Sequence, residues 1–287
     1  MELNYLTEKR ICAVCGNEFE TVKTTVFGRE FILKKFCQPC ADKLIEAERE
    51  KEEAKRQGEI SGQRRLWREN CGISPRYMSE DFSTFKTDRP GNVAEVYRKC
   101  LDYADGFPVD YNAWLKRTNQ AYPSLLLYSP GATGNGNGKT HLVMSIAHRI
   151  LDRWQGENIA RPVQVINEPD IYDRIQQTYS YSMQEREQKQ SEQDIIALYS
   201  RVRLLIIDDL GKVQRRDMEF VRRTLYAIIN RRYDALLPVV ITTNKDADGL
   251  KNYLGNDSEQ ATFDRIIGMT QGKFIQVKGA SYRRPLK

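Results

Sequence analysis

The chain has 287 residues, with 45 Lys and Arg against 39 Asp and Glu, which gives a formal net charge of +6. Apolar residues make up 40% and charged residues 29%, so the composition excludes an intrinsically disordered chain and allows one large domain or two unequal ones. No apolar run approaches the roughly 18 residues that span a bilayer, and the N-terminal segment lacks the apolar stretch of a secretory signal. We therefore expect a cytoplasmic protein with no membrane partner, whose mild positive charge allows a nucleic-acid partner without requiring one.

Two cysteine pairs near the N-terminus predict a metal site. Cys12 and Cys15 form one CxxC motif, and Cys37 and Cys40 form a second. Four thiolates are enough to close a tetrahedral zinc site, the usual arrangement of a structural site. Two disulfides or a redox CxxC are the competing interpretations, but a cytosolic setting disfavours disulfides and a redox motif needs no second pair. The remaining two cysteines stand alone in the sequence and are interpreted as buried or free thiols.

Residues 1–40 predict a zinc ribbon. Residues 19–26 are rich in β-branched side chains, Gly28 offers a turn, and residues 29–36 can return as a second strand. A unit this small depends on its metal for stability. Zinc ribbons bind nucleic acid or protein, and both kinds of partner stay open at this point.

A charged helical linker is expected at residues 41–64. Residues 41–57 are mostly helix formers, with Glu and Lys at i,i+3 and i,i+4 spacing, which predicts a solvated helix. Gly58 and Gly62 mark its expected end. A basic DNA-binding helix is less favoured, because acidic residues balance the basic ones. The linker leads to a third region, residues 65–287.

A nucleotide-binding motif lies at the centre of the chain. Residues 124–128 form a short apolar run, a Gly-rich loop follows, and residues 141–151 are apolar at helical spacing. A strand, a loop ending in Gly-Lys-Thr and a helix are the context of a P-loop, whose backbone N–H groups surround phosphate oxygens. Lys139 then reaches the β- and γ-phosphates of ATP, and Thr140 places its hydroxyl on Mg²⁺. The loop residues expected to contact the nucleotide are Gly134, Asn135, Gly136, Asn137, Gly138, Lys139, Thr140 and His141.

The Gly-rich loop is longer than the usual P-loop pattern. Counted from Gly131, it contains two extra residues, as if Gly-Asn had been repeated. The Gly-Lys-Thr end is intact, so phosphate binding is still expected, and a looser loop mouth would change affinity or turnover.

Two later strands supply the second half of an ATP site. Residues 203–211 are a buried strand that ends in two carboxylates, a Walker B pattern, with Asp208 on the nucleotide's Mg²⁺ and Asp209 placed to polarise the attacking water. The strand at 237–244 ends in Asn244, whose amide can orient water or the γ-phosphate. Strands alternating with helices imply an α/β fold, a parallel sheet covered on both faces, with ligands at the carboxyl ends of its strands.

From about residue 65 to the end, the sequence resembles the AAA+ ATPases of the bacterial DnaC/DnaI helicase-loader and IstB transposition-helper group. The segments that carry the resemblance are residues 66–77 and 81–85 ahead of the core, the Walker A residues 138–142, the Walker B residues 204–212, the sensor 1 residues 241–244, residues 263–267 and residues 281–283. The resemblance implies ATP hydrolysis by a ring or spiral homo-oligomer. It also implies that Arg265 completes the neighbouring subunit's site as an arginine finger and that Arg283 acts as sensor 2 in its own subunit.

Three alternative functions are compatible with these motifs. The first is a helicase loader that binds a hexameric replicative helicase and places it on single-stranded DNA. The second is a transposition helper that coats DNA and recruits a transposase. The third is a zinc-ribbon adaptor that binds nucleotide without useful turnover. The zinc ribbon, the segment ahead of the core and the terminal Ser281-Tyr-Arg283 favour the first.

Two stretches outside the ATP site are left open. The polar stretch 179–193 is interpreted as uncapped and lies where loaders carry an extra helix. It is expected to be either a contact for DNA or a neighbouring subunit, or a surface loop. Arginines between residues 215 and 231 flank the apolar stripe of an expected helix. They are placed either to follow a phosphate backbone or to form ion pairs between subunits.

Overall fold

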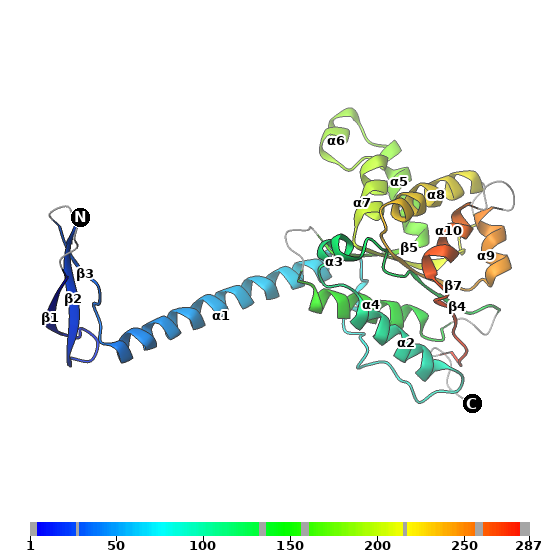
Figure 1. Cartoon of the computed structure of the whole chain (residues 1–287). Coiled ribbons are helices and arrows are strands. Elements are labelled where there is room, and N and C mark those ends of the chain that lie inside the picture. Colours follow the sequence, from blue (N-terminus) through cyan, green and yellow to red (C-terminus); the bar gives the residue numbers. More distant parts are fainter. Residues whose placement is uncertain are drawn as a thin grey trace. The chain divides into compact units, whose positions relative to one another are not determined.

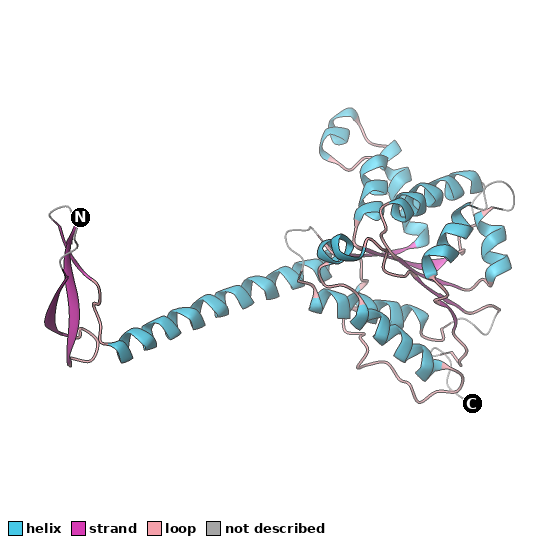
Figure 2. Cartoon of the chain, viewed as in Figure 1, coloured by secondary structure: helices cyan, strands magenta, loops and turns pink. Residues whose placement is uncertain are grey.

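The computed structural model describes residues 5–26, 29–131, 136–155, 161–214, 217–255 and 261–281. The chain divides into two compact units, Met1–Gln63 and Arg64–Lys287, which are described separately below (Figure 1). Figure 2 shows magenta strands followed by a cyan helix in the first unit, and strands interspersed with helices in the second. Among the described residues, no helix combines the length and the apolar character needed to cross a bilayer.

The first unit is built on a three-stranded antiparallel sheet. Strands β1 (Tyr5–Ile11), β2 (Glu18–Val26) and β3 (Arg29–Ile32) lie in sequence order, and Ile11 faces Glu18 across the first turn. The sequence predicted β2 and β3 but not β1, whose mixed charged and apolar residues give a weak strand pattern. The turn after β1 carries the first cysteine pair and is closed by the Cys12 amide, which donates to the Asn17 carbonyl at 2.8 Å.

Helix α1 (Gln38–Asn70) begins at the second cysteine pair. The predicted end at Gly58 and Gly62 is wrong, because the helix continues through both glycines. A helical glycine costs up to about 1 kcal/mol relative to alanine, but the residues around these two are strong helix formers, and propagation is cheaper than starting a new helix. The last turn of α1 belongs to the second unit, where Trp67 is buried.

The second unit contains the predicted parallel sheet. Its strands are β4 (Leu125–Tyr128), β5 (Val163–Asn167), β6 (Leu204–Leu210), β7 (Val239–Thr243) and β8 (Phe274–Gln276). They lie in the order β5-β6-β7-β4-β8, and every neighbouring pair is parallel. The carboxyl ends of β4, β6 and β7 therefore meet at one edge, where the sequence placed its candidate residues.

Helices cover both faces of this sheet (Figure 1). Helices α2 (Val93–Gly106), α3 (Tyr111–Thr118) and α4 (Lys139–Arg153) pack with Leu125, Leu127 and Ile206 on one face. Helices α5 (Glu168–Tyr179), α7 (Glu192–Arg201), α8 (Met218–Asp234), α9 (Ala247–Leu254) and α10 (Ala261–Thr270) pack with Leu126 and Ile207 on the other. Because successive strand residues point to opposite faces, a continuous apolar run is what a strand buried on both sides requires.

The polar stretch before β6 is helical and capped. Helix α6 (Met183–Gln188) and α7 each begin with a capping box, in which Ser182 pairs with Glu185 and Ser191 pairs with Asp194. Our sequence interpretation of this stretch as uncapped was wrong. The signal was present as Ser-x-x-Glu and Ser-x-x-Asp spacing, which satisfies amide groups at a helix start.

One arginine of α8 is completely buried. Arg232 donates to the carbonyls of Tyr199 at 2.8 Å, Val202 at 2.9 Å, Arg203 at 3.4 Å and Pro238. It continues the apolar stripe of α8 at helical spacing, so the stripe itself could have identified it. Its guanidinium ties α7, the start of β6 and the start of β7 together.

Candidate functional site

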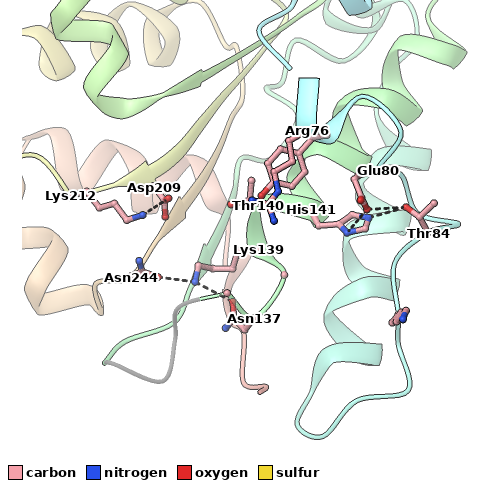
Figure 3. Close-up of a pocket in the computed structure, with 14 residues that line it drawn as sticks. Arg76, Glu80, Thr84, Asn137, Lys139, Thr140, His141, Asp209, Lys212 and Asn244 are labelled. Carbon is pink, nitrogen blue, oxygen red and sulfur yellow. Dashed lines mark hydrogen bonds and ion pairs between the residues drawn. The ribbon is translucent and has the colours of Figure 1, made fainter. Parts of the chain in front are cut away.

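A cavity of about 580 Å³ opens at the carboxyl edge of the sheet (Figure 3). Its lining combines the end of the Gly-rich loop, the start of α4, the ends of β6 and β7, and a segment ahead of the core. The lining residues are Arg76, Tyr77, Glu80, Thr84, Lys86, Gly136, Asn137, Gly138, Lys139, Thr140, His141, Asp209, Lys212 and Asn244. The sequence-predicted residues from three separate motifs are thus brought to one place.

The end of the Gly-rich loop has the backbone of an anion-binding turn. Gly136 has φ 81° and Gly138 has φ 101°, conformations that favour glycine. Gly138 is also the N-cap of α4, so the helix N-terminus, which favours a bound anion, faces the cavity. The predicted contacts Gly134 and Asn135 lie outside the described residues.

Lys139 is buried and held by two amide oxygens. Its Nζ donates to Asn137 Oδ1 at 3.2 Å and to Asn244 Oδ1 at 2.9 Å. Burial lowers the pKa of Lys139 to about 8, while the nearby carboxylates of Asp209 and Asp208 raise it. These two amide partners are neutral, and the charged oxygens of a phosphate would form stronger hydrogen bonds with the ammonium.

Asn137 has a structural part in this arrangement. Its side chain is buried, and its Nδ2 donates to Ser129 Oγ at 2.6 Å and to the Val277 carbonyl at 3.0 Å. These bonds fix the loop to the end of β4 and to the segment after β8. The side chain that the sequence assigned to nucleotide contact thus orients Lys139.

Asp208 and Thr140 face each other across the strand edge. The hydroxyl of Thr140 donates to Asp208 Oδ2 at 3.0 Å, and Thr242 Oγ1 donates to Asp208 Oδ1 at 2.6 Å. Burial and then the charge of Asp209 raise the pKa of Asp208. A carboxylate penalised in this way, beside a hydroxyl, fits a bound divalent cation, whose charge would offset the penalty.

Asp209 has an unusual backbone. Its φ is 60°, in the left-handed region that non-glycine residues rarely adopt, and the pairing of β6 with β7 shifts register between Ile207 and Leu210. The Asp209 amide donates to Thr242 Oγ1 at 2.8 Å, and its carboxylate forms an ion pair with Lys212 (Figure 3). The bulge turns the Asp209 side chain into the cavity, away from the strand's regular alternation.

His141 contacts the segment ahead of the core. Its Nδ1 lies 3.2 Å from Glu80 Oε2, and its Nε2 lies 2.8 Å from the Asp81 carbonyl and 3.2 Å from Thr84 Oγ1. The ring also packs edge-on against Phe85, with centroids 5.0 Å apart. The P-loop helix and this segment therefore form one wall of the cavity.

Residues 131–287, more than half of the chain, match the family described as IstB-like ATP binding protein. The chain belongs to the family of IstB-like ATP-binding proteins. The P-loop end, the Walker B carboxylates and Asn244 all lie within the residues of this IstB-like protein that match the family.

Solved structures with the same fold include two described as a DnaC helicase loader and DnaI. The DnaC structure is 17% identical with a TM-score of 0.52 and covers 71% of this chain and 100% of its own. The DnaI structure is 18% identical with a TM-score of 0.50 and covers 74% and 95%. A putative primosome component from Streptococcus pyogenes gives 17% and 0.50, covering 74% and 93%. These likenesses confirm the AAA+ P-loop fold.

Curated relatives include the chromosomal replication initiator protein DnaA of Chloroflexus aurantiacus and of Chloroflexus aggregans. Each is 26% identical over 175 residues, which are 60% of this chain. The match spans only 29% of the length of each relative.

Part of the cavity wall of this IstB-like protein was not predicted. The cavity is also lined by Arg76, Tyr77, Glu80, Thr84 and Lys86, although no role for individual residues of this segment was predicted from the sequence. The available signal was the phenylalanines at positions 82 and 85, which are buried and anchor the segment against the P-loop side of the unit. The placement depends on tertiary packing, which no local pattern specifies.

Neither of the two arginines predicted to act on the nucleotide is found among the described residues that line this cavity. Arg265 does not line the cavity; its guanidinium lies over the rings of Tyr226 and Tyr233 on α8, at 5.4 and 5.7 Å from their centroids. Arg283 lies outside the described residues, as do Arg215 and Arg216 of the arginine series.

Two further arginines of α8, Arg222 and Arg223, have local partners. Arg222 Nε donates to the Tyr253 carbonyl at 3.1 Å, and Arg223 lies over the Phe220 ring. Neither contact uses up the whole guanidinium, so these residues do not discriminate between the DNA and the inter-subunit interpretations.

The four N-terminal cysteines of this protein cluster as predicted. The ligand atoms of Cys12, Cys15, Cys37 and Cys40 all lie within 4.8 Å of one another, and the Sγ atoms of Cys15 and Cys37 are 3.5 Å apart. A tetrahedral zinc ion with Zn–S bonds of about 2.3 Å needs sulfurs roughly 3.8 Å apart, so this set fits that ion. All six cysteines of the chain are free thiols.

Proposed function

We propose that this IstB-like protein hydrolyses ATP in the cavity at the sheet edge. The observation that carries the proposal is the convergence of Lys139, Thr140, Asp208, Asp209 and Asn244 from three motifs. Mg²⁺, when bound, would neutralise charge on the phosphates, and Thr140 and Asp208 are the residues placed to hold it. Lys139 would exchange its amide partners for phosphate oxygens.

Asp209 is the proposed general base. Its carboxylate faces the cavity, and its present partner is the exposed ammonium of Lys212. For Asp209 to accept a proton from water, that ion pair has to open or the second carboxylate oxygen has to act. Asn244, released from Lys139, would orient the water or the γ-phosphate.

The two arginines would complete the site in an oligomer. Arg265 would reach the nucleotide of a neighbouring subunit and stabilise charge on the leaving phosphate, while Arg283 would contact the nucleotide of its own subunit. In the isolated chain Arg265 lies on two tyrosines of α8, a contact it would keep or exchange on assembly.

The proposed biological role is that of a helicase loader. The ATPase region, proposed as residues 65–287, would act on a hexameric replicative helicase and single-stranded DNA. A zinc ribbon at residues 1–40, joined to it by the linker 41–64, would bind the helicase. The support is the fold shared with structures described as DnaC and DnaI, and the tetra-cysteine cluster ahead of it. The second candidate is a transposition helper, which the IstB-like family match favours.

Hydrolysis is tested with Lys139→Ala and Asp209→Asn in the full chain. Both should reduce ATP turnover at least about a hundredfold, and only Lys139→Ala should also weaken nucleotide binding, because Asp209 acts on the reaction and not on ground-state phosphate. Lys99→Ala serves as the control, since Lys99 is an exposed lysine of α2 paired with Glu95. If the wild-type protein does not hydrolyse ATP even when DNA and partner proteins are present, the zinc-ribbon adaptor would be favoured.

The role is tested by capture. The full chain should retain a replicative ring helicase, and the variant with Cys12 and Cys15 changed to Ser should not. Binding of duplex DNA with filament formation, and no helicase retained, would favour the transposition helper.

A further inference from the structure

A buried carboxylate outside the cavity connects three elements behind the Walker B loop. Glu168, the first residue of α5, is completely buried. Its Oε1 accepts hydrogen bonds from Tyr172 at 2.9 Å and from Tyr253 of α9 at 2.6 Å. Its Oε2 accepts one from the Gly211 amide at 2.7 Å. A carboxyl group in this position is costly to bury, so all three bonds are needed to keep it there.

The Gly211 bond fixes the chain two residues after Asp209. Asp209 sits in a left-handed backbone conformation, and such a conformation persists only where its surroundings hold it. On one side the Asp209 amide is held by Thr242; on the other, the Leu210 carbonyl accepts from Thr243 Oγ1 at 2.6 Å and the Gly211 amide donates to Glu168. Three bonds on consecutive residues thus set the direction of the Asp209 side chain.

We propose that Glu168 is a positioning residue for ATP hydrolysis, acting on Asp209 through the Gly211 amide. The inference rests on the proposed role of Asp209 as the base. The carboxylate does not touch the nucleotide cavity, so its loss should affect the reaction without affecting binding. Misplacing a reacting group by about 1 Å can cost on the order of a hundredfold in rate.

The two carboxylate oxygens allow a matched comparison. Glu168→Met removes the acceptor of Gly211 together with those of both tyrosines. The double variant with Tyr172 and Tyr253 changed to Phe removes only the two Oε1 donors and keeps the Gly211 bond. Glu168→Gln is the conservative variant, because its amide oxygen can still accept from Gly211 while its NH₂ group donates to the tyrosine hydroxyls.

The test measures kcat, nucleotide Kd and the unfolding temperature of the full-length variants. Glu168→Met should lose at least tenfold in kcat with a Kd within about twofold of wild type, and Glu168→Gln should recover most of the loss. The double tyrosine variant should unfold at a lower temperature and keep its kcat. If Glu168→Met does not fold, Glu168→Asp replaces it, since the shorter side chain keeps a carboxylate but cannot reach all three donors.

Wild-type kcat in Glu168→Met or Glu168→Asp would overturn the proposal, as would an equal kcat loss in the double tyrosine variant. Asp209→Asn, measured in parallel, distinguishes failure of the positioning role of Glu168 from failure of the proposed role of Asp209 as the base. Full turnover in Asp209→Asn would refute the proposed base itself. An inactive Asp209→Asn beside a fully active Glu168 variant would refute only the positioning role.

Discussion

Each of the two units of the chain is stabilised internally by different interactions. Among the described residues of the first unit, the buried side chains are Cys12, Thr21, Thr24 and Cys40, while Leu6, Ile11, Phe31 and Leu33 are exposed. The second unit buries two large apolar clusters, one on each face of its sheet. A sheet without an apolar core cannot offset the entropy of folding, so the first unit needs its thiolate cluster.

The same contrast applies to how each site is built. The cysteine site supplies two of the four buried side chains described in its unit, and that unit has no apolar core to replace it, so losing one ligand should unfold the unit. The ATP site sits on a sheet that is stable for other reasons, so single changes there should alter chemistry more than folding.

Changing Cys12 to Ser should unfold the first unit and release its metal. Structural zinc contributes on the order of 10 kcal/mol or more to folding of small units, and a hydroxyl is a poor substitute for a thiolate ligand. Metal analysis should give one zinc per wild-type chain and much less in the variant. Cys100→Ala, at a buried thiol of α2, is the control and should keep its zinc. Equal zinc content in all three proteins would contradict the assignment.

Changing Arg232 to Met should destabilise the second unit by at least about 3 kcal/mol, because four buried carbonyls lose a charged donor. Its neighbour in sequence, Arg231, is exposed, and Arg231→Ala should change the free energy of unfolding by less than about 0.5 kcal/mol. Denaturant unfolding of both variants gives the comparison. Similar effects for the two would show that Arg232 does not tie the elements together.

Nucleotide affinity should weaken as pH rises above about 8, where buried Lys139 loses its proton. Phosphates favour the charged form, so binding raises this pKa, and affinity falls by up to about tenfold per pH unit above the value of the free protein. The lowered pKa also means that charged Lys139 destabilises the nucleotide-free folded protein below pH 8. This destabilisation decreases as the pH rises from about 8 toward the pKa of the lysine in the unfolded chain. Titration calorimetry from pH 7 to 9.5 measures the effect.

Lys139→Arg is the control for this pH dependence. Its guanidinium stays charged throughout the range, so the affinity of this variant, whatever its level, should be flat with pH. A wild-type affinity that does not change between pH 7 and 9.5 would contradict the assignment of Lys139 as the phosphate-binding cation.

Changing Gly58 and Gly62 to Ala should stabilise α1 by about 0.5 to 1 kcal/mol each. A Cβ at either position meets nothing within 4 Å, so no steric cost opposes the gain in helix propensity. Helix content measured by circular dichroism during thermal unfolding is the readout. A loss of helicity in the double variant would show that the glycines serve a bend or a contact.

Much of the second unit could be predicted from the sequence because its signals are local and ordered. Gly-Lys-Thr after a strand, two carboxylates after a second strand and Asn244 after a third determine both the sheet and the edge where the site lies. The metal site could be predicted in the same way, because the spacing of the two CxxC motifs allows all four thiolates to bind one ion.

The features that escaped prediction depend on contacts between distant segments. The wall formed by Glu80 and Thr84 depends on how the segment ahead of the core packs against His141. Glu168 reads as an ordinary first-turn acid of α5 until the fold brings Gly211 and Tyr253 to it. The contact of Arg265 with two tyrosines was not predicted either, because both tyrosines belong to another helix, α8.

Calorimetric unfolding tests whether the first unit depends on its metal while the nucleotide-binding core is stable by itself. Wild type and the Cys12→Ser variant are each scanned with and without Mg·ATP. At about a hundred times Kd, ATP should stabilise the core by roughly 2.7 kcal/mol and raise its transition by several degrees, equally in both proteins. The variant should lose only the transition of the first unit. Loss of the ATP-dependent rise in Cys12→Ser would contradict the account.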